Sequence, residues 1–377
     1  MKIGVPKETA EGERRVALVP DVVRSLRKKN EKVDVLIEAG AGEAAGHPDA
    51  QYVDAGAEIA PAEAIWSADV VLKVGVPSAE EVARLGPNQI YVSHLNPWVA
   101  ADTNKALAAS GATAFAMEAI PRTTRAQAMD ALSSQAAAAG YAAMLIAARE
   151  SGRFFGMMTT AAGTVPPAKV LVLGAGVAGL QAVATAKRLG AIVTGFDIRR
   201  AAWEQIASLG GRPLELDFIP DAEGEGGYAR PLTEEENAQV RDALGENAAK
   251  QDVIVTTAAI PGRAAPILIT ADAVRGMQPG SVIVDLAAET GGNCELTEPG
   301  QTVEENGVKV IGPRNLPSLM PVPASQLYAK NLENLLGLMI TEEGELNVNL
   351  SDDILAAALI TQGGEIKNER AAGRTDA

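Results

Sequence analysis

Cysteine, histidine and aromatic residues are scarce in this chain of 377 residues. The single cysteine, Cys294, cannot form an internal disulfide bond, which agrees with a reducing compartment. Two histidines, His47 and His94, are too few for a histidine-based metal cluster, so we expect no metal site. Aromatic residues make up 3% of the chain and hydrophobic residues 47%, so the cores must be built from alanine, valine, leucine and isoleucine.

Several targeting and catalytic patterns are also missing. The N-terminal stretch MKIGVPKETAEGERR has no apolar segment after its first basic residue, so we do not expect a signal peptide. The longest weakly polar run, 170–186, contains three glycines, and we expect no segment that inserts into a membrane. The sequence has no G-x-S-x-G motif, no Cys–His pair and no Walker motif, so nucleophilic and phosphoryl-transfer chemistry are unsupported.

Positive charge is in the minority. The chain has 33 lysines and arginines against 48 aspartates and glutamates, which gives a net charge of −15 and a pI near 4.8. This balance argues against binding to nucleic acid or to an anionic membrane surface. An acidic surface that keeps the protein soluble explains it best, and a positively charged protein partner stays open.

The clearest motif is KVLVLGAGVAGLQAVATAKRLGAIVTGFD, at 169–197, in which G-x-G-x-x-G directly follows an apolar strand. Gly174 allows a tight turn, Gly176 lets the backbone approach a pyrophosphate, and Gly179 lets a helix pack on the strand. That helix, from about Val177, points its partly positive N-terminus at the phosphate. The motif predicts a dinucleotide site.

Asp197 closes the second strand of this motif, 18 residues beyond Gly179. An acid at about this distance accepts hydrogen bonds from the adenosine ribose hydroxyls and repels a 2′-phosphate, which favours NAD(H) over NADP(H). The alternative is a βαβ unit with a structural role alone. We favour nucleotide binding because strand, helix, second strand and acid occur in the required order.

The length suggests two domains. The first 120 residues alternate apolar runs with helical patterns, which is typical of a doubly wound parallel sheet. We predict strands at 2–5, 33–37, 70–74, 89–93 and 113–116, and helices at 21–28, 79–85 and 101–110.

A second α/β unit begins at Lys169, after an Ala-rich helix predicted at 132–150 that crosses between domains. Its predicted strands are 170–173, 192–196, 213–216, 253–256, 282–285 and 308–311. A helix at 324–338 returns to the first domain and is followed by a polar tail, with disorder expected at 368–377. The polar segment 217–232 is expected to be a mobile surface loop.

The predicted fold class is therefore α/β. It comprises two doubly wound, Rossmann-like parallel-sheet domains separated by a cleft and joined by long helices. The first domain is discontinuous, 1–132 plus 320–377, and the nucleotide-binding domain is 133–319.

A second informative segment, PRTTRAQAMDALSSQ at 121–135, lies at the predicted domain junction. Its notable polar residues are Arg122, Arg125, Gln127, Asp130 and Ser133. Arginine can pair with an acid or a pyrophosphate, glutamine can bond a carboxamide, and junctions of this kind often hold ligands. Alternatively Asp130 and Ser133 only cap a helix, and composition does not decide between these hypotheses.

Other candidates are weaker. Lys7, Glu8, Arg14 and Arg15 lie near the N-terminus, where a solvated loop is the simpler interpretation. Lys73 ends a predicted strand at the edge where α/β sheets place ligands. His94 is a candidate general base, but we favour a strand-end residue that bonds backbone. Glu289, after the strand ending at Asp285, lies at the same kind of edge.

With these residues in view, the chain resembles the superfamily of alanine dehydrogenase and proton-translocating transhydrogenase. The shared segments are MKIGVPKE, RRVALVP, GAGVAG and VDLAAETGGN. Within this superfamily, three segments resemble the transhydrogenase NAD(H)-binding component (domain I, which some bacteria make as a separate alpha-subunit chain). They are PRTTRAQAMDALSSQ, MTTAAGTVPPAKVLVLGAGVAGLQAVATAKRLGA and GGYAR. The resemblance covers essentially residues 1–350.

The resemblance implies direct hydride transfer between NADH bound here and NADP+ held on a partner domain, coupled to proton translocation. Arg122, Gln127 and Asp130 would be the catalytic residues, with Ser133 also at the nicotinamide end and Gln127 reaching towards the second nucleotide. The other implied nucleotide contacts are Thr123, Thr124, Arg125, Gly174, Gly176, Val177, Gly179, Asp197, Ile198, Arg199, Gly227, Tyr228 and Ala259. Gly227 and Tyr228 belong to the lid, and Ala259 stands where the family usually has a bulkier leucine.

The resemblance also implies partners. The family usually forms a homodimer through the nucleotide domain, and the membrane-spanning helices and NADP(H) site belong to other subunits. We therefore expect a cytoplasmic subunit, attached peripherally to the inner membrane through those partners.

The alanine dehydrogenase branch is the runner-up. It requires an arginine and a lysine to bind a carboxylate, matched by Arg15 and Lys73, and a histidine base, matched by His94. Its aspartate, however, is replaced by the longer Glu289, which argues against oxidative deamination. A nucleotide-sensing regulatory module without turnover is a third hypothesis.

Overall fold

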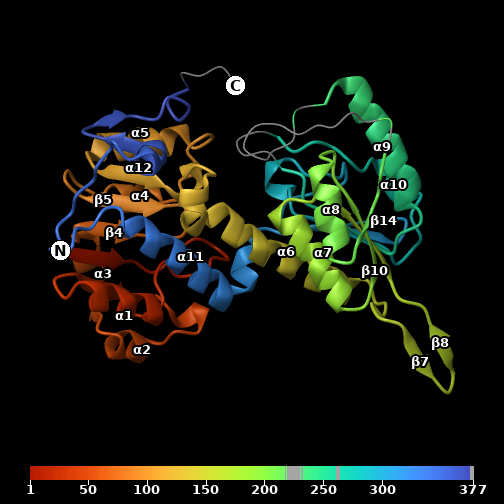
Figure 1. The fold of residues 1–377 in the computed structure, drawn as a ribbon, viewed down its shortest axis with the longest axis horizontal. Coiled ribbons are helices and arrows are strands. Elements are labelled where there is room, and N and C mark those ends of the chain that lie inside the picture. Colours follow the sequence, from red (N-terminus) through yellow and green to blue (C-terminus); the bar gives the residue numbers. More distant parts are fainter. Residues whose placement is uncertain (217, 219–229, 231, 260–263, 374–377) are drawn as a thin grey trace. The chain divides into compact units, whose positions relative to one another are not determined.

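Two separate units form in the computed structural model, which describes residues 1–216, 218, 230, 232–259 and 264–373 (Figure 1). One unit comprises Met1–Gln135 with Pro317–Ala377, and the other Ala136–Leu316. We propose that the domains of the protein follow this division.

The first unit is built on an eight-stranded sheet with the order β17-β16-β6-β5-β4-β1-β2-β3. Its strands are β1 (Lys2–Val5), β2 (Asp34–Glu38), β3 (Glu58–Ala60), β4 (Val70–Leu72), β5 (Ile90–Ser93), β6 (Thr113–Ala116), β16 (Leu359–Gln362) and β17 (Glu365–Ile366). Strands β1 to β6 are parallel, whereas β16 and β17 add an antiparallel edge. The chain reverses direction between β1 and β4, and ligand sites in such sheets lie at the carboxyl ends of strands at this point.

Helices cover both faces of this sheet, as the near-continuous apolar strands require. They are α1 (Pro20–Lys29), α2 (Asp49–Asp54), α3 (Ala62–Trp66), α4 (Ala79–Val82), α5 (Ala101–Ser110), α11 (Pro321–Leu336) and α12 (Asp353–Ala358), with the short 3₁₀ helices η1 (Glu43–Ala45), η2 (Met117–Ala119), η3 (Thr124–Met129) and η6 (Leu316–Leu319). In α1 the sequence explains the ends, because proline opens the helix, Asp21 lies in the first turn and Lys28 in the last.

The C-terminal segment differs from the sequence-based expectation. It is not a polar tail, because α12 and β16 bury Ile354, Leu355 and Ile360 and extend the sheet beside β6. The described part of 368–377 forms turns, with the Arg370 guanidinium 4.6 Å from the centre of the Trp98 ring. The expectation of disorder is therefore wrong for 368–373, and 374–377 lie outside the described residues.

The second unit has a seven-stranded sheet with the order β11-β10-β9-β12-β13-β15-β14. Its strands are β9 (Lys169–Leu173), β10 (Ile192–Phe196), β11 (Arg212–Pro213), β12 (Val253–Thr256), β13 (Val282–Asp285), β14 (Thr302–Glu305) and β15 (Val308–Ile311). All pairs are parallel except β14 with β15. The doubly wound α/β class is thus confirmed, although β11 is shorter than predicted and β14 was missed.

The helices among the described residues of this unit pack around the sheet or connect its strands: α6 (Ala131–Glu150, from Ala136 on), α7 (Val177–Arg188), α8 (Ala201–Ser208), α9 (Glu234–Ala248) and α10 (Ala271–Arg275), together with η5 (Ala288–Thr290). The chain runs β9, β10, β11 to one side and then returns with β12 to the other side of β9. The reversal point therefore lies between β9 and β12, beside the glycine motif.

Helix α6 has an unusual composition for a helix of 20 residues, because nearly half of it is alanine. By length and composition it meets the criteria for crossing a membrane, with 44% of its apolar window buried within the structure. Core helices of soluble proteins meet the same criteria.

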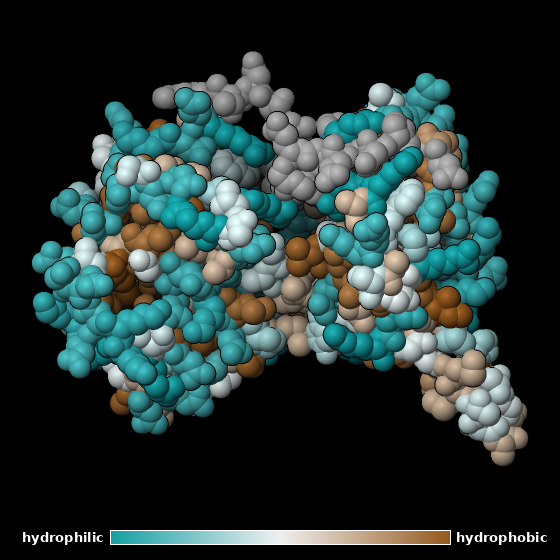
Figure 2. All heavy atoms as spheres, in the orientation of Figure 1, coloured by the Kyte–Doolittle hydropathy of each residue, from teal (hydrophilic) through white to brown (hydrophobic). Residues whose placement is uncertain are grey.

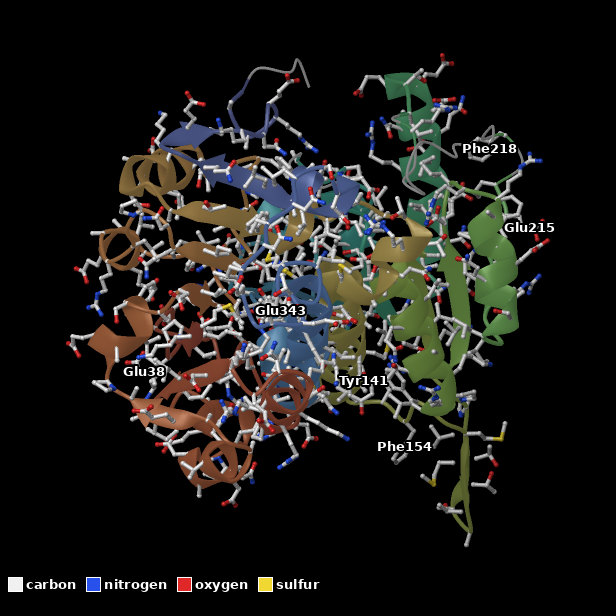
Figure 3. The ribbon with its side chains drawn as sticks, turned by 60° about the vertical axis from the view of Figure 1, so that its left-hand side comes forward. Glu38, Tyr141, Phe154, Glu215, Phe218 and Glu343 are labelled. Atoms are coloured by element: carbon white, nitrogen blue, oxygen red, sulfur yellow. The ribbon has the colours of Figure 1, made fainter. Side chains whose placement is uncertain are left out.

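A two-stranded hairpin, β7 (Met158–Thr160) and β8 (Gly163–Val165), extends from the second unit (Figure 1). All six strand residues are exposed, and Figure 2 shows its side chains in pale brown and white rather than teal. Figure 3 shows Phe154, which is 53% exposed, in the segment that leads into it. An isolated two-stranded hairpin is marginally stable in water.

Candidate nucleotide site

The glycine motif occupies the turn between β9 and α7. Gly174 has a φ of +92°, and a Cβ there would lie 2.8 Å from the Thr257 hydroxyl oxygen. A Cβ on Gly179 would lie 1.8 Å from the Gly174 carbonyl oxygen, so only glycine lets α7 pack this closely on the turn. At Gly176, by contrast, a Cβ would meet no atom of the described residues within 4 Å. The backbone is thus open where the motif expects the pyrophosphate.

The first turn of α7 faces this open space. Gly176 is the N-cap residue, and no described side chain caps this helix end. Because the first amides of a helix have no partner within the helix, they are available to an anion, and the helix dipole favours negative charge there. Val177 is 40% exposed at the same end.

Asp197 follows β10 directly and its carboxylate is held against the glycine turn. Oδ2 accepts a hydrogen bond from the Ala175 amide at 2.7 Å. Oδ1 accepts from the Arg199 amide and from Arg199 Nε, both at 2.9 Å, and Oδ2 also accepts from Arg199 Nη2 at 2.8 Å. Four donors therefore share a side chain that is 7% exposed, so any further donor to this carboxylate must compete with the Arg199 guanidinium.

The residues around Asp197 reinforce its position. Trp203 Nε1 donates to the Asp197 carbonyl at 2.9 Å, and the Arg200 guanidinium lies 5.9 Å from the centre of the Trp203 ring. Ile198 packs against the apolar core of the unit. Trp203 is consequently fixed beside the end of β10.

On the other side of the turn, two polar residues that sequence reasoning missed hold the loops after β12 and β13. Asp285 is fully buried and accepts hydrogen bonds from the Thr256 and Thr297 hydroxyls and from three backbone amides. Asn293 bonds both the amide and the carbonyl of Ala258, which positions the exposed Ala259. The sequence signal for Asp285 and Asn293 was the motif VDLAAETGGN. The motif alone does not show whether its aspartate is a buried structural residue or binds a ligand.

The junction segment 121–135 belongs to the first unit. Asp130 accepts from the Ser133 amide at 2.8 Å and from its hydroxyl at 2.6 Å, and so caps the start of α6. Arg125 forms a bidentate pair with Asp352, at 2.7 and 2.8 Å, and also contacts Asp353. The hydrogen bonds from Arg125 lower the pKa of Asp352 to about 2.

Arg122, Thr123, Thr124 and Gln127 are exposed in the same segment. The Gln127 carboxamide forms no hydrogen bond with any residue that the structure describes. The sequence-predicted residues therefore form two groups: this segment in the first unit, and the glycine turn with Val177, Asp197, Ile198, Arg199 and Ala259 in the second. Gly227 and Tyr228, and most of the expected loop at 217–232, lie outside the described residues.

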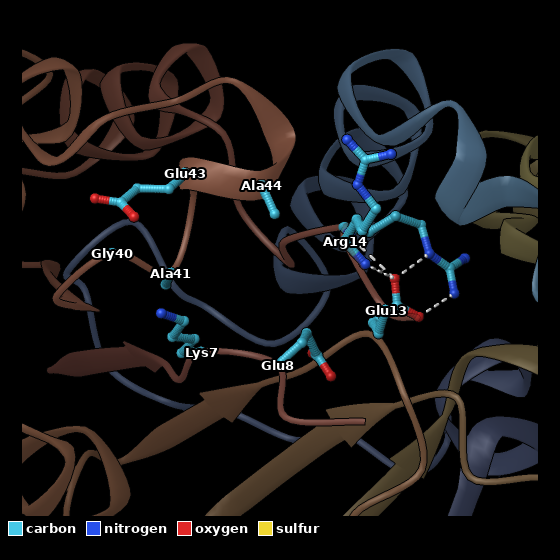
Figure 4. Close-up of a pocket in the computed structure, with 9 residues that line it drawn as sticks. Lys7, Glu8, Glu13, Arg14, Gly40, Ala41, Glu43 and Ala44 are labelled. Atoms are coloured by element: carbon cyan, nitrogen blue, oxygen red, sulfur yellow. Dashed lines mark hydrogen bonds and ion pairs between the residues drawn. The ribbon is translucent and has the colours of Figure 1, made fainter. Parts of the chain in front are cut away.

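A small pocket of about 140 Å³ lies at the carboxyl ends of β1 and β2 in the first unit (Figure 4). Its lining residues are Lys7, Glu8, Glu13, Arg14, Arg15, Gly40, Ala41, Glu43 and Ala44. Arg15 Nη2 lies 2.6 Å from Glu13 Oε2. Burial alone would raise the pKa of Glu13, but hydrogen bonds from Arg15 and Ser318 hold it at about 2.

The lysine of the dehydrogenase hypothesis contacts Glu8, which lines this pocket, and the histidine lies in the same unit. Lys73 is 1% exposed, and its Nζ lies 2.9 Å from Glu81 and 3.3 Å from Glu8. Burial raises the pKa of Glu8 although Lys73 opposes the shift. His94 Nδ1 lies 3.5 Å from Glu118, so its ring contacts a carboxylate and not only backbone as favoured from the sequence. Lys73 is thus paired with two carboxylates within the unit.

A glycine turn, an open helix N-terminus and an acid at the end of the next strand, all at the reversal point of a parallel sheet, define a Rossmann-type protein. Such sheets bind dinucleotides at this edge. Among the residues that the structure describes, no group of three or more potential ligands could hold a metal ion.

Comparison with known families makes the assignment specific. The models described as "Alanine dehydrogenase/PNT, N-terminal domain" and "Alanine dehydrogenase/PNT, C-terminal domain" match residues 4–139 and 143–369. The chain belongs to the alanine dehydrogenase/PNT family, as the sequence motifs predicted. Membership implies binding of a nicotinamide dinucleotide and an oxidoreductase role.

Relatives within the family distinguish its branches. The chain is 46% identical to the NAD(P) transhydrogenase subunit alpha of Haemophilus influenzae, over 97% of this chain and 71% of that one. It is 45% identical to an NAD(P) transhydrogenase alpha-subunit chain of Rhodospirillum rubrum, over 99% of this chain and 100% of that one. An alanine dehydrogenase of Halomonas elongata is 33% identical, over 97% and 94%.

Solved structures also show greater similarity to a transhydrogenase than to an alanine dehydrogenase. A transhydrogenase from Sinorhizobium meliloti superposes with a TM-score of 0.89 and 43% identity, covering 97% of this chain and all of that one. An L-alanine dehydrogenase superposes with a TM-score of 0.83 and 30% identity, covering 99% of each. The transhydrogenase branch is therefore the more similar in both sequence and structure.

Proposed function

We propose that this chain is the NAD(H)-binding peripheral subunit of a proton-translocating NAD(P) transhydrogenase. The observation that carries the choice of nucleotide is the Asp197 carboxylate, which the Ala175 amide holds beside the glycine turn. An ionised acid there bonds ribose hydroxyls and repels a 2′-phosphate. The transhydrogenase relatives support the proposal, because they are named as alpha subunits.

The proposed chemistry is direct hydride transfer. The C4–H bond of NADH breaks, and its electron pair moves with the hydrogen to C4 of NADP+ held by a partner subunit. No proton is exchanged with a side chain, so the protein contributes position and exclusion of water. Transfer requires the two C4 atoms at roughly 3–3.5 Å.

The exposed carboxamide of Gln127 is proposed to reach towards the second nucleotide, with Arg122, Thr123 and Thr124 beside it at the nicotinamide end. Asp130 and Ser133 fix the start of α6 next to this turn. Contact of Arg125 with nucleotide would require it to exchange its bonds to Asp352 and Asp353.

At the adenosine end, Asp197, Ile198 and Arg199 are proposed to surround the ribose, with Val177 over the pyrophosphate and Ala259 on the far side of the turn. Gly227 and Tyr228 are proposed to belong to a lid. Together with the glycines, these residues complete the proposed nucleotide contacts.

The proposed assembly is a homodimer that binds membrane-spanning and NADP(H)-binding subunits, at the cytoplasmic side of the inner membrane. Coupling to proton translocation would take place through those partners. The exposed β7–β8 hairpin supports the homodimer, since Met157 is 66% exposed and Met158 41%. A second copy of the chain would cover them.

The competing function is an amino-acid dehydrogenase, favoured by Arg15, Lys73 and His94 gathering in one unit. Calorimetric titration with NADH and NADPH, followed by an assay with NADH, pyruvate and ammonia, separates the proposals. We expect preferential NADH binding and no oxidation of NADH in the assay. Rapid oxidation would make the chain a dehydrogenase, and equal affinity for NADPH would contradict the role of Asp197.

A further inference from the structure

Helix α6 contacts the first turn of α7 through bare backbone. A Cβ on Gly140 would lie 2.0 Å from the Ala178 carbonyl oxygen, 2.8 Å from its carbonyl carbon and 2.9 Å from its Cα. All three atoms are main-chain atoms, which cannot rotate away as the end of a side chain can. Gly140 is buried in the interior of α6, where alanine would otherwise be the favoured residue.

Ala178 is the second residue of α7, two positions after Gly176. The same turn has a second close contact, where Gly179 approaches the Gly174 carbonyl oxygen. Two glycine contacts thus restrain the turn whose amides face the pyrophosphate position. One belongs to the sequence motif, and the other comes from a helix that precedes the motif in the chain (Figure 1).

We propose that Gly140 is a fourth glycine of the dinucleotide site, a positioning residue that sets where the first turn of α7 presents its amides to the pyrophosphate. This inference rests on the proposed nucleotide binding and deepens it. Gly140 does not touch nucleotide, so it acts only through the position of Ala178.

Gly140→Ala is the direct test, because the added methyl group must displace α6 or the first turn of α7. Misplacement of positioning groups by about 1 Å can cost about 100-fold in rate at a catalytic site, and we take this as the upper scale for the loss of affinity here. We therefore expect affinities for NADH and for ADP-ribose to fall about 10- to 100-fold. Adenosine has no pyrophosphate and binds at Asp197, so its affinity should change by less than about threefold.

Gly245→Ala is the matched control. Gly245 also lies inside a helix, α9, but a Cβ there would lie 3.5 Å from the Ala273 Cβ, an ordinary contact. This variant should keep wild-type affinities and unfold at a slightly higher temperature, because alanine favours the helix. Titrations can be followed by the fluorescence of Trp203, with circular dichroism to confirm folding.

The outcomes distinguish failure of the proposed nucleotide binding from failure of the positioning role of Gly140. If wild-type protein fails to bind NADH, the proposed function fails. If wild-type protein binds NADH and Gly140→Ala binds it equally well, or loses adenosine to the same extent, the positioning role is wrong.

Hydrogen exchange of wild-type protein provides a test that does not depend on the folding of a variant. ADP-ribose should slow exchange in α6 around Gly140 as well as in the first turn of α7, whereas adenosine should not. Protection of α7 without α6 would contradict the coupling between the two helices.

Discussion

Replacing Asp197 by serine tests the ribose end of the site. Asp197→Ser removes the negative charge and at least two of the four hydrogen bonds that the carboxylate accepts from Ala175 and Arg199. An ionised carboxylate about 4 Å from a 2′-phosphate repels it by about 4 kcal/mol at an effective dielectric constant of about 20. Arg199 Nη2, at 2.8 Å from the same carboxylate, offsets part of this repulsion.

We expect the preference for NADH over NADPH to fall by about 10- to 100-fold, which corresponds to about 1.4 to 2.8 kcal/mol. The variant should also unfold at a lower temperature, because the Ala175 amide loses its acceptor. Affinities are therefore measured by calorimetry well below the unfolding transition. Asp272→Ser, at an acid whose side chain is 91% exposed on α10, is the control. Unchanged nucleotide preference in Asp197→Ser would refute the assignment.

Three further changes test other parts of the account. Gln127→Asn should slow hydride transfer strongly while NADH affinity stays within about threefold, and equal loss of both would indicate ordinary ground-state binding. Glu13 has a lowered pKa of about 2 against 4.5, so its stabilising effect is present above pH 4.5 and is lost as the pH falls towards 2. Glu13→Gln should flatten the pH dependence of unfolding in that window, by an amount on the order of 3 kcal/mol, and an unchanged profile would contradict the pairing with Arg15. Met158→Lys should shift the molar mass measured by light scattering from dimer to monomer, whereas Val99→Lys, at a side chain 61% exposed in the first unit, should not. A persistent dimer in Met158→Lys would place the interface elsewhere.

The sequence predicted the elements whose residues lie close together in the chain. The glycine motif and Asp197 follow one another at fixed spacing, so the sequence indicated strand, turn, helix and acid together. The apolar strands of the two sheets were equally clear because both faces of the sheets are covered. Sequence spacing could not show that Arg199 occupies the Asp197 carboxylate, since that depends on a side-chain conformation.

Contacts between distant segments explain most of the differences. Strand β16 pairs with β6 only because the chain returns to the first unit, and its short apolar run gave no periodic signal. In the junction segment the caps Asp130 and Ser133 were foreseen as an alternative, but the pairing of Arg125 with Asp352 joins residues far apart in the chain. The contact of Gly140 with Ala178 likewise joins two separate helices, so no local pattern indicates it.

The central claim is direct transfer of hydride from NADH on this chain to NADP+ on a partner. The most direct measurement mixes this chain with a transhydrogenase NADP(H)-binding domain, NADH deuterated on the transferred C4 position and an NADP+ analogue, and follows the label. The account predicts reduction that requires both proteins, with deuterium on C4 of the reduced analogue and none released to water. Loss of the label to solvent, or no reduction although both nucleotides bind, would contradict it.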